Sequence, residues 1–463
     1  MIQKLKPIKY QLEGIELMVK FGSCIQADDM GLGKTMQTIL TIEKLQSYPC
    51  LIICPASLKL NWEIEISKWS DKRGMILNDS IKNTFPLLYK AGISDYFIVN
   101  YESLSKYFVH SKPNRKDFRL DDIVFNEYRN FFKSVIVDES HRVKDVKSLQ
   151  SKLTAGICMG ADKNVFLLSG TPTLNTVLDL APQLYIAKKI HHFGGYTKFI
   201  SDYKDADIDK LSLLHKKLIK TSMIRREKKD VAGLPKKTRQ VIYVDIDNRT
   251  EYNAAVKDLA SYLKEYRGKT DSEVRRSMRG EVMVRVGILK QLSGIGKVNA
   301  VKEHIQNLHE QGEKVILFGE NIDVLESFKA MKNTVSIVGG MSSESKQYSI
   351  NKFQTDKITN LIVCSLKAAG VGVTLTAGRI VSFIQQGWHP AIMNQAEDRG
   401  HRLGQEKEVH CLYYIGKNTI DEHIYNIIEK KRKTSNAITG TTEDIEWAVI
   451  DEVIDLILNE NDN

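Results

Sequence analysis

The sequence lacks several features that would assign it to particular protein classes. It has no apolar run near the roughly 20 residues that a membrane-spanning helix needs, so no membrane segment is predicted. The lysines of residues 1–7 are not followed by an apolar core, which argues against a secretory signal. The six cysteines form no C-x-x-C pair and lie among apolar stretches. We therefore expect no zinc site and predict reduced core thiols in a cytoplasmic protein.

Charge is unevenly distributed along the chain. The 463 residues carry a formal net charge of +10, and the sequence pI is about 9.0. Residues 443–463 contain eight Asp or Glu and no Lys or Arg, so without them the charge rises from +10 to +18. A basic body indicates a polyanionic partner, most commonly nucleic acid, although a generic lysine-rich surface is the alternative.

The acidic end of the chain has its own pattern. Its aliphatic residues recur at helical spacing, which predicts an acidic amphipathic tail over residues 441–463. Such a tail would pack on the body or on a protein partner. The aliphatic residues are Val449, Ile450, Val453, Ile454 and Ile457.

Short runs rich in Val, Ile and Leu recur in two groups, separated by helical-looking segments. Apolar strands without alternation, spaced by helices, are typical of parallel sheets covered on both faces. The sequence therefore predicts an α/β fold with two lobes. The runs cover residues 51–54, 97–100, 134–138 and 165–168, and then 314–318, 335–338, 361–365, 380–384 and 409–415.

A charged stretch separates the two groups. Residues 216–239 contain ten Lys or Arg and are interrupted by Leu234-Pro235, so we place the lobe junction there. The first lobe is predicted over residues 1–233, with a helical insertion at about 179–222. The second lobe is predicted over residues 234–440, with a helical insertion at about 250–292.

The segment from Ile25 to Thr35 has the pattern of a strand end, a turn and a helix start. Gly31 and Gly33 let the backbone curl so that its N–H groups point at phosphate oxygens. Lys34 would bring a positive charge to the β and γ phosphates, and the Thr35 hydroxyl would be a magnesium ligand. The predicted ATP-binding residues are Gln11, Asp28, Asp29, Met30, Gly31, Leu32, Gly33, Lys34 and Thr35.

Two members of this set have alternative interpretations. Asp28 stands where the usual pattern G-x-x-x-x-G-K-T has its first glycine, so the segment alone does not establish phosphate binding. Gln11, with Tyr10 beside it, is a candidate for reading adenine. A capping or surface glutamine is an equal alternative on spacing alone.

Asp138 and Glu139 directly follow the apolar run of residues 135–137. They are therefore expected at the carboxyl edge of a parallel strand, where ligands bind in open α/β sheets. Asp138 would hold Mg²⁺ through water, and Glu139 would orient and deprotonate the attacking water. A solvated pair of loop carboxylates is the alternative, and Lys34 upstream weighs against it.

Three residues near residue 400 share a spacing. Gln395, Arg399 and Arg402 stand at i, i+4 and i+7, which predicts one face of a helix. That face could supply cations to the γ-phosphate, and an arginine finger contributes about 10³- to 10⁵-fold in rate. A solvated charged face is the alternative.

Taken in order, these segments resemble the SWI/SNF-type helicase-like ATPases of helicase superfamily 2, over about residues 5–438. The motifs DESH and MIRR are similar to those of the branch that contains annealing helicases and fork-remodelling translocases. Asp29, Gly387 and His389 depart from the family pattern, but none replaces a phosphate or metal contact. The resemblance is carried by KYQLEG, ADDMGLGKT, LIICPASLKLNW, VNYESL, VDESHRVKD, LLSGTPTLN, MIRREKKDV, FGEN, SLKAAGVGVTLT, GWHPAIMNQAEDRGHRLGQ and TIDEHIYNIIEKK.

The resemblance implies a P-loop NTPase of two RecA-like lobes with helical protrusions and a brace helix over about residues 419–433. It also implies ATP and Mg²⁺ as cofactors, duplex or forked DNA as partner, and an ATP-driven motor that DNA stimulates. Ser169 and Thr171 would couple hydrolysis to lobe movement, as would Ser365, Gly370 and Thr374 from the second lobe. The expected nucleic-acid contacts are Pro55, Ser57, Lys59, Asn61, Tyr101, Ser365 and Thr374.

Three other functions stay open at this point. A strand-separating helicase would need a wedge that no motif marks. An RNA-directed motor would need a group that reads the 2′-hydroxyl, and no such residue is visible. A catalytically idle DNA-binding scaffold is disfavoured because Lys34, Asp138, Glu139, Arg399 and Arg402 are all present.

Overall fold

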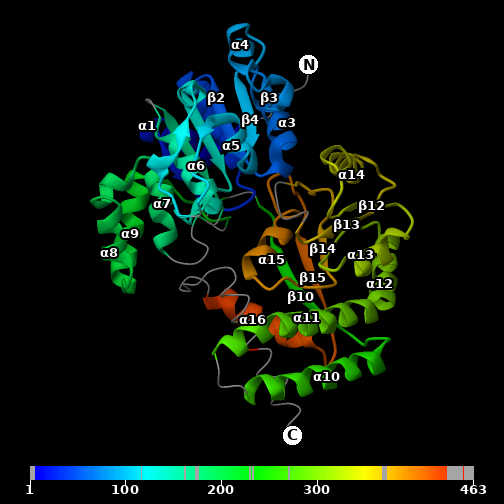
Figure 1. Cartoon of the computed structure of the whole chain (residues 1–463). Helices are drawn as coiled ribbons and strands as arrows, with labels where there is room; N and C mark the ends of the chain where they lie inside the picture. The colour runs from blue at the N-terminus through cyan, green and yellow to red at the C-terminus, as the bar shows by residue number, and fades with distance from the viewer. Residues whose placement is uncertain are drawn as a thin grey trace. The chain divides into compact units, whose positions relative to one another are not determined.

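The structure is a computed structural model that describes residues 6–115, 117–160, 163–170, 172, 177–228, 231, 234–268, 272–367, 373–434 and 452. The chain divides into two compact units, Met1–Ala232 and Gly233–Asn463. Each unit contains a parallel sheet with helices around it (Figure 1). The two predicted parallel-sheet lobes are thereby confirmed as the fold class.

The sheet of the first unit has seven parallel strands in the order β3-β4-β2-β7-β8-β1-β9. The four predicted runs are four of these strands, and their side chains are almost entirely buried. The strands are β1 Cys24–Gln26, β2 Cys50–Cys54, β3 Gly74–Ile76, β4 Tyr96–Asn100, β7 Ser134–Asp138, β8 Asn164–Leu168 and β9 Met223–Ile224.

The helices of this unit complete a core against one face of the sheet, to which Leu51, Val135 and Val165 contribute. A short antiparallel pair, β5 Val109–Ser111 and β6 Val124–Phe125, lies outside the main sheet. Three helices, α7 to α9, occupy the region of the predicted first insertion. The helices are α1 Lys9–Phe21, α2 Lys34–Leu45, α3 Lys59–Trp69, α4 Phe85–Lys90, α5 Leu104–Phe108, α6 Leu149–Cys158, α7 Leu180–Ile186, α8 Tyr196–Tyr203 and α9 Ile208–Thr221.

The sheet of the second unit has six parallel strands in the order β10-β15-β14-β11-β13-β12. Five of them are the predicted runs. The sixth, β10, begins at the end of the charged stretch and continues to Val244, and no strand was predicted there. The strands are β10 Lys237–Val244, β11 Val315–Gly319, β12 Thr334–Ile337, β13 Leu361–Ser365, β14 Ile380–Phe383 and β15 Val409–Gly416.

Helices α10 and α11 form the region of the predicted second insertion, and they share an apolar cluster with α16. The last of these coincides with the predicted brace helix. The helices of this unit are α10 Arg249–Gly268, α11 Ser272–Gly296, α12 Val298–Glu310, α13 Ile322–Lys329, α14 Ser343–Thr355, α15 Pro390–Glu397 and α16 Ile420–Thr434.

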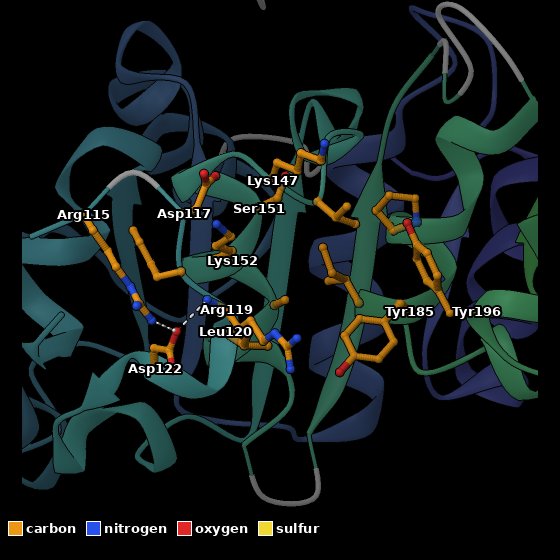
Figure 2. Close-up of a pocket in the computed structure, with 15 residues that line it drawn as sticks. Arg115, Asp117, Arg119, Leu120, Asp122, Lys147, Ser151, Lys152, Tyr185 and Tyr196 are labelled. Atoms are coloured by element: carbon orange, nitrogen blue, oxygen red, sulfur yellow. Dashed lines mark hydrogen bonds and ion pairs between the residues drawn. The ribbon is translucent and has the colours of Figure 1, made fainter. Parts of the chain in front are cut away.

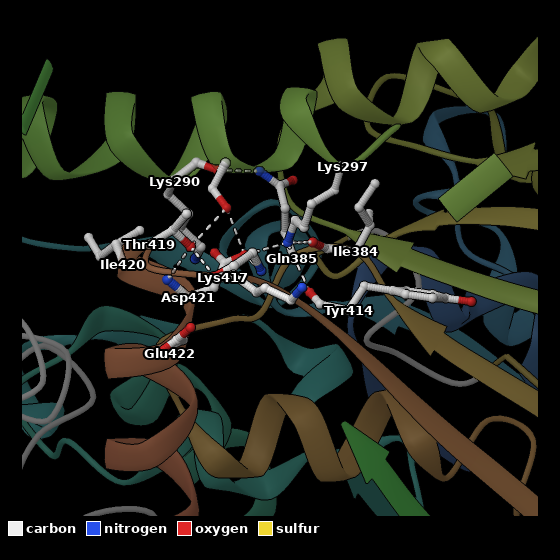
Figure 3. Close-up of polar contacts among 12 residues, drawn as sticks. Lys290, Lys297, Ile384, Gln385, Tyr414, Lys417, Thr419, Ile420, Asp421 and Glu422 are labelled. Carbon is white, nitrogen blue, oxygen red and sulfur yellow. Dashed lines mark hydrogen bonds and ion pairs between the residues drawn. The ribbon is translucent and has the colours of Figure 1, made fainter. Parts of the chain in front are cut away.

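A buried lysine joins α16 to the sheet of this unit (Figure 3). Lys297 is fully buried between α11 and α12, and its ammonium donates to Ile384 O, Tyr414 O and the Asp421 carboxylate. Ser293 Oγ also donates to Asp421, over 2.7 Å. Because every donor of the ammonium is used, this ion pair fixes the start of α16 against β14 and β15.

Among the residues that the structure describes, no helix combines the length and apolarity that a bilayer crossing requires. All six cysteines are buried and unpaired. Burial raises the pKa of Cys24 and of Cys50 to about 12, so these thiols are protonated and inert at neutral pH.

Candidate functional site: a nucleotide-binding loop and a pair of carboxylates

A tight loop connects β1 to α2. Gly31 and Gly33 have φ angles of 84° and 80°, a left-handed conformation that costs other residues roughly 1–2 kcal/mol each. Gly33 is the N-cap of α2, a helix of 12 residues, so the first-turn N–H groups of that helix face the loop. Lys34 Nζ donates to Asp28 O over 2.8 Å and to Asp29 O over 3.2 Å. The loop therefore has the geometry of an anion-binding site at a helix N-terminus.

Asp28 supports this loop from inside. Its side chain is completely buried, and Oδ2 accepts from Gln26 Nε2, Gln37 Nε2 and Arg226 Nη1 at 3.2, 3.4 and 3.1 Å. Any contact of Asp28 with a nucleotide would therefore be made by its backbone. The ion pair with Arg226 explains how a carboxylate is accommodated where the usual loop has a glycine, because the charge is neutralised beneath the phosphate site.

Two arginines from the MIRR segment hold the loop, and the sequence analysis did not assign them a role. Arg225 Nη1 donates to Ala27 O over 2.7 Å and to Gly170 O over 2.9 Å, while its Nη2 lies 2.9 Å from Asp29 Oδ1. Arg226 pairs with Asp28 as described above. The sequence contains a signal for these contacts, a pair of adjacent arginines and a pair of adjacent aspartates, but the arginines were interpreted only as part of the lobe junction and of the family resemblance.

Gln11 and Leu32 lie against the same loop. Gln11 Oε1 accepts from Ile8 N over 3.1 Å at the start of α1, and Gln11 Nε2 lies 3.4 Å from Leu32 O. This is the capping arrangement that the sequence analysis gave as the alternative, and adenine recognition by Gln11 stays a prediction. The Leu32 side chain is fully buried, so only its backbone could contact a nucleotide.

Asp138 and Glu139 stand at the carboxyl end of β7, as the sequence predicted. Asp138 Oδ2 accepts from Trp62 Nε1 over 2.8 Å, and Oδ1 accepts from Glu139 N over 2.9 Å. Burial, followed by the charge of Glu139, raises the pKa of Asp138 to about 7, although Trp62, the Glu139 amide and Lys34 oppose this shift. Glu139 has a φ of 51°, an unusual conformation for a residue with a Cβ. Such strain is concentrated at functional sites.

Trp62 is a site residue that the sequence analysis quoted only within a motif. It is fully buried on α3, and the loop that precedes it contains the predicted nucleic-acid residues Pro55, Ser57 and Lys59. With Asn61 these residues lie at the carboxyl end of β2 and the start of α3, and their contact with nucleic acid stays a prediction. One short segment thus connects that surface to the Asp138 carboxylate.

Tyr101 requires a correction. It was predicted to contact nucleic acid, but its side chain is 1% exposed, so any such contact would be made by its backbone. Its hydroxyl donates to Asp138 O over 2.6 Å, and Arg142 lies 5.0 Å from its ring centre. The tyrosine is therefore part of the support beneath β7, because an apolar ring with one internal hydrogen bond is most stable in the core.

His141 links Glu139 to Ser169. Its Nδ1 lies 3.4 Å from Glu139 Oε2 and 3.2 Å from Ser169 Oγ. Burial, helped by Arg142, lowers the pKa of His141 to about 4, so the ring is neutral at physiological pH. Ser169, predicted to couple hydrolysis to movement, is thus one hydrogen-bonding side chain away from the predicted base. Thr171 lies outside the described residues.

The predicted cationic face needs a second correction. Gln395 is in α15, but that helix ends at Glu397, so Arg399 and Arg402 lie in the following turns and not on a helix face. Short-range bonds such as Gly400 N to Glu397 O close these turns, and Gly404 adopts a φ of 96°. The helix therefore ends before both arginines, despite the helical spacing of the polar residues.

The turns nevertheless bring three predicted residues of the second unit together. Arg402 Nη1 donates to Thr374 Oγ1 over 2.8 Å and lies 3.3 Å from Val373 O. Arg399 is 3% exposed, and its Nη1 lies 3.4 Å from Val373 O. Ser365 stands at the end of β13 and is nearly buried. Gly370 lies outside the described residues.

Glu397 anchors the segment that carries these arginines. It is fully buried and accepts from Lys237 Nζ over 2.7 Å, from Arg239 Nε over 2.6 Å and from Tyr413 Oη over 2.6 Å. Arg432 of α16 lies 3.8 Å away. Burial alone would raise the pKa of Glu397, but the cations outweigh it, Lys237 most of all, and lower the pKa to about 2. β10 and α16 therefore hold the end of α15 in place.

Two family models together match most of the chain. The family described as SNF2-related domain matches residues 10–295, and the family described as helicase conserved C-terminal domain matches residues 296–404. Among solved structures, the chain is 24% identical to the Sulfolobus solfataricus SWI2/SNF2 ATPase core in complex with dsDNA, with a TM-score of 0.43. That similarity covers 96% of this chain and 95% of the other.

Two curated relatives extend over nearly the whole chain. Human DNA annealing helicase and endonuclease ZRANB3 is 30% identical over 96% of this chain and 41% of its own length. The Caenorhabditis elegans homologue of SWI/SNF-related matrix-associated actin-dependent regulator of chromatin subfamily A-like protein 1 is 31% identical over 93% of this chain and 61% of its own length. The chain thus spans less than two thirds of each. The chain belongs to the SNF2-related family of helicase-like proteins.

Proposed function

We propose that this chain is a DNA-stimulated ATPase that uses ATP hydrolysis to move along, or remodel, duplex or forked DNA. One observation carries the proposal: a phosphate loop with Lys34 and the carboxylates Asp138 and Glu139 all lie at the carboxyl edge of one parallel sheet. This is where ligands bind in open α/β folds. The names of the relatives, a DNA annealing helicase among them, support DNA as the polymer.

The residues fit ATP with Mg²⁺. Thr35 and Asp138 would be the protein's ligands, and Mg²⁺ usually keeps several waters and needs only one or two carboxylates besides phosphate oxygens. A carboxylate as deeply buried as Asp138, with a raised pKa, is stabilised when a cation binds it. Among the described residues no cluster of three or more His, Cys, Asp or Glu could hold a metal, which fits an ion that shares its ligands with the substrate. When bound, the ion would neutralise charge on the β and γ phosphates.

The protein residues then have separate roles in hydrolysis. Lys34 would exchange its two backbone carbonyl partners for phosphate oxygens. Glu139 would accept a proton from the attacking water, in an orientation set by its left-handed backbone and by His141. Arg399 and Arg402 would neutralise charge that develops on the transferred phosphoryl group.

Movement requires that hydrolysis be communicated to the nucleic-acid surface. In the first unit two connections of the required kind exist: Glu139 to Ser169 through His141, and Asp138 to the start of α3 through Trp62. Contacts to phosphates carry no sequence information, so we propose binding that is non-specific and strongly salt-dependent.

The test is an ATPase assay on the purified chain with no polymer, single-stranded DNA, duplex DNA, forked DNA and RNA. We expect the fastest phosphate release with duplex or forked DNA. Equal rates with and without every polymer would refute a DNA-stimulated motor, and stimulation by RNA alone would identify an RNA-directed one.

Two further expectations remain proposals. Residues 441–463 lie outside the described residues except for Glu452, so a protein partner for the acidic tail is supported by charge and pattern alone. A cytoplasmic location is supported by the six buried thiols, which suit a reducing compartment.

A further inference from the structure

A cavity of about 870 Å³ lies in the first unit, away from the nucleotide-binding loop. Three parts of the chain line it: residue 115 with residues 117–122, residues 146–155 at the start of α6, and the helical insertion with α7 and α8. Figure 2 shows Arg115 and Asp122 on one side and Tyr185 and Tyr196 on the other. Neither the proposed hydrolysis nor any predicted nucleic-acid residue uses this cavity.

The charges on its wall are unbalanced. Arg115 Nη2 pairs with Asp122 Oδ2 over 3.3 Å, and the same oxygen accepts from Arg119 N over 2.8 Å, so this pair is internally satisfied. Within the described part of the chain, no carboxylate lies at ion-pair distance from the side chains of Arg119, Lys147 or Lys152. Against these three cations stands one further carboxylate in the lining, Asp117. The cavity therefore attracts an anion.

The walls between these charges are aromatic and apolar. The rings of Tyr185 and Tyr196 meet edge to face with centres 6.4 Å apart, and Phe118 lies under Lys152 Nζ at 4.4 Å. Val146 is an exposed apolar side chain in the rim. A ligand that satisfies this cavity must present both a flat apolar body and negative charge.

We infer that this cavity binds an unpaired nucleotide of single-stranded DNA, with its base among the aromatic side chains and its phosphate near Arg119 and Lys147. Aromatic faces combined with cations are the general means of holding single strands. A base inside a duplex is stacked and could not enter a recess, so only the phosphates of a duplex could touch the rim. The volume is within the 300–1,000 Å³ range of small-ligand pockets.

The inference rests on the proposed function and adds a substrate feature to it. Lys147 lies only nine residues after Asp138, in the segment that continues from the catalytic carboxylates. A strand held there would place single-stranded DNA on the same unit as the proposed ATPase site of a motor that works on forks.

The experiment measures the affinity of the full chain for a labelled thymidine oligonucleotide and for a blunt duplex of equal length, over a series of salt concentrations. The first variant combines Arg119→Ala with Lys147→Ala. Its matched control combines Lys20→Ala with Lys90→Ala, which removes two exposed lysines of the same unit outside the cavity. We expect the slope of log K against log salt for the single strand to fall by about 0.7, the value for the one phosphate that the two cations hold. The control should show the parent slope, and the affinity of every variant for the duplex should be unchanged.

A second pair of variants tests the base. Tyr196→Ala should weaken single-strand binding about 5- to 150-fold, because stacking of a base on an aromatic ring has this magnitude. Tyr196→Phe keeps the ring and should bind like the parent. An oligonucleotide without bases should bind the parent and Tyr196→Ala equally.

The possible results are distinct. Unchanged single-strand binding in both cavity variants, or an equal loss for strand and duplex, would overturn the inference. A synthetic peptide of residues 443–463 provides a further test. If it binds the parent more tightly than the single strand does, and if the same variants weaken its binding, the cavity is a peptide site and the inference is overturned. If DNA stimulates the parent ATPase while the cavity variants bind normally, only this inference fails. If no DNA stimulates the parent, the proposed function fails as well.

Discussion

Replacing Trp62 by Phe tests the most direct contact to the predicted metal-binding carboxylate. The change removes one N–H that donates to Asp138 Oδ2 over 2.8 Å in a buried setting. A hydrogen bond to a charged group contributes about 1.5–3 kcal/mol. If the charged, Mg²⁺-binding form of Asp138 loses that stabilising free energy, the Mg²⁺ concentration for half-maximal ATPase activity should rise about 10- to 150-fold.

The pH dependence of the ATPase activity is an independent test of the hydrogen bond between Trp62 and Asp138. The pKa of Asp138 is raised to about 7, so its charged form develops as pH rises through neutrality. A carboxyl whose folded pKa lies above its unfolded value stabilises the fold below the unfolded pKa, and this contribution is lost as pH rises through the folded pKa. Trp62 favours the charged form, so Trp62→Phe should move the rise in activity to higher pH.

A matched control lies on the same helix. Trp69 Nε1 donates to Glu65 Oε2 over 2.9 Å at the surface of α3, so Trp69→Phe removes an equivalent bond far from β7. We expect parent-like Mg²⁺ and pH dependence in this control, with thermal unfolding recorded for both variants. The reasoning is refuted if Trp62→Phe keeps the parent Mg²⁺ requirement, or if both variants shift alike.

Three further variants probe other contacts. Glu139→Gln should retain ATP binding in an equilibrium assay but lose about 10²- to 10⁴-fold in hydrolysis, because a general base contributes that much; near-parent turnover would remove the assignment. Arg402→Ala should also bind ATP while hydrolysis falls about 10³- to 10⁵-fold, and a smaller loss of rate would show that Arg402 is not the finger. Arg226→Met leaves the buried Asp28 without its cation, so urea unfolding should show a loss of about 3–5 kcal/mol. A variant as stable as the parent would mean that this pair does not support the loop.

The central strands could be predicted because they are short, apolar and buried on both faces. Others could not. β3 is only half-buried, β9 has two residues, and β10 carries Lys237 and Arg239. β10 becomes a strand through pairing with β15 along its full length, and its cations are stabilised by Glu397, far away in the sequence. Neither the pairing with β15 nor the ion pairs with Glu397 can be inferred from the local sequence pattern.

The site divides in a similar way. The phosphate loop and Asp138-Glu139 are contiguous in sequence, so their chemistry could be inferred from local spacing. The partners that support them are distant: Trp62 is 76 residues from Asp138, and Arg226 is 198 residues from Asp28. Arg399 was misplaced on a helix because the polar spacing was given more weight than the glycines that follow it.

The central claim is that ATP hydrolysis drives movement along DNA, and displacement of a third strand from a triplex measures that movement without requiring separation of the duplex. We predict release of the third strand by the parent chain with ATP and Mg²⁺, and none with ADP or with Glu139→Gln. ATP-independent release, or no release by a preparation whose ATPase is stimulated by the same duplex, would contradict it.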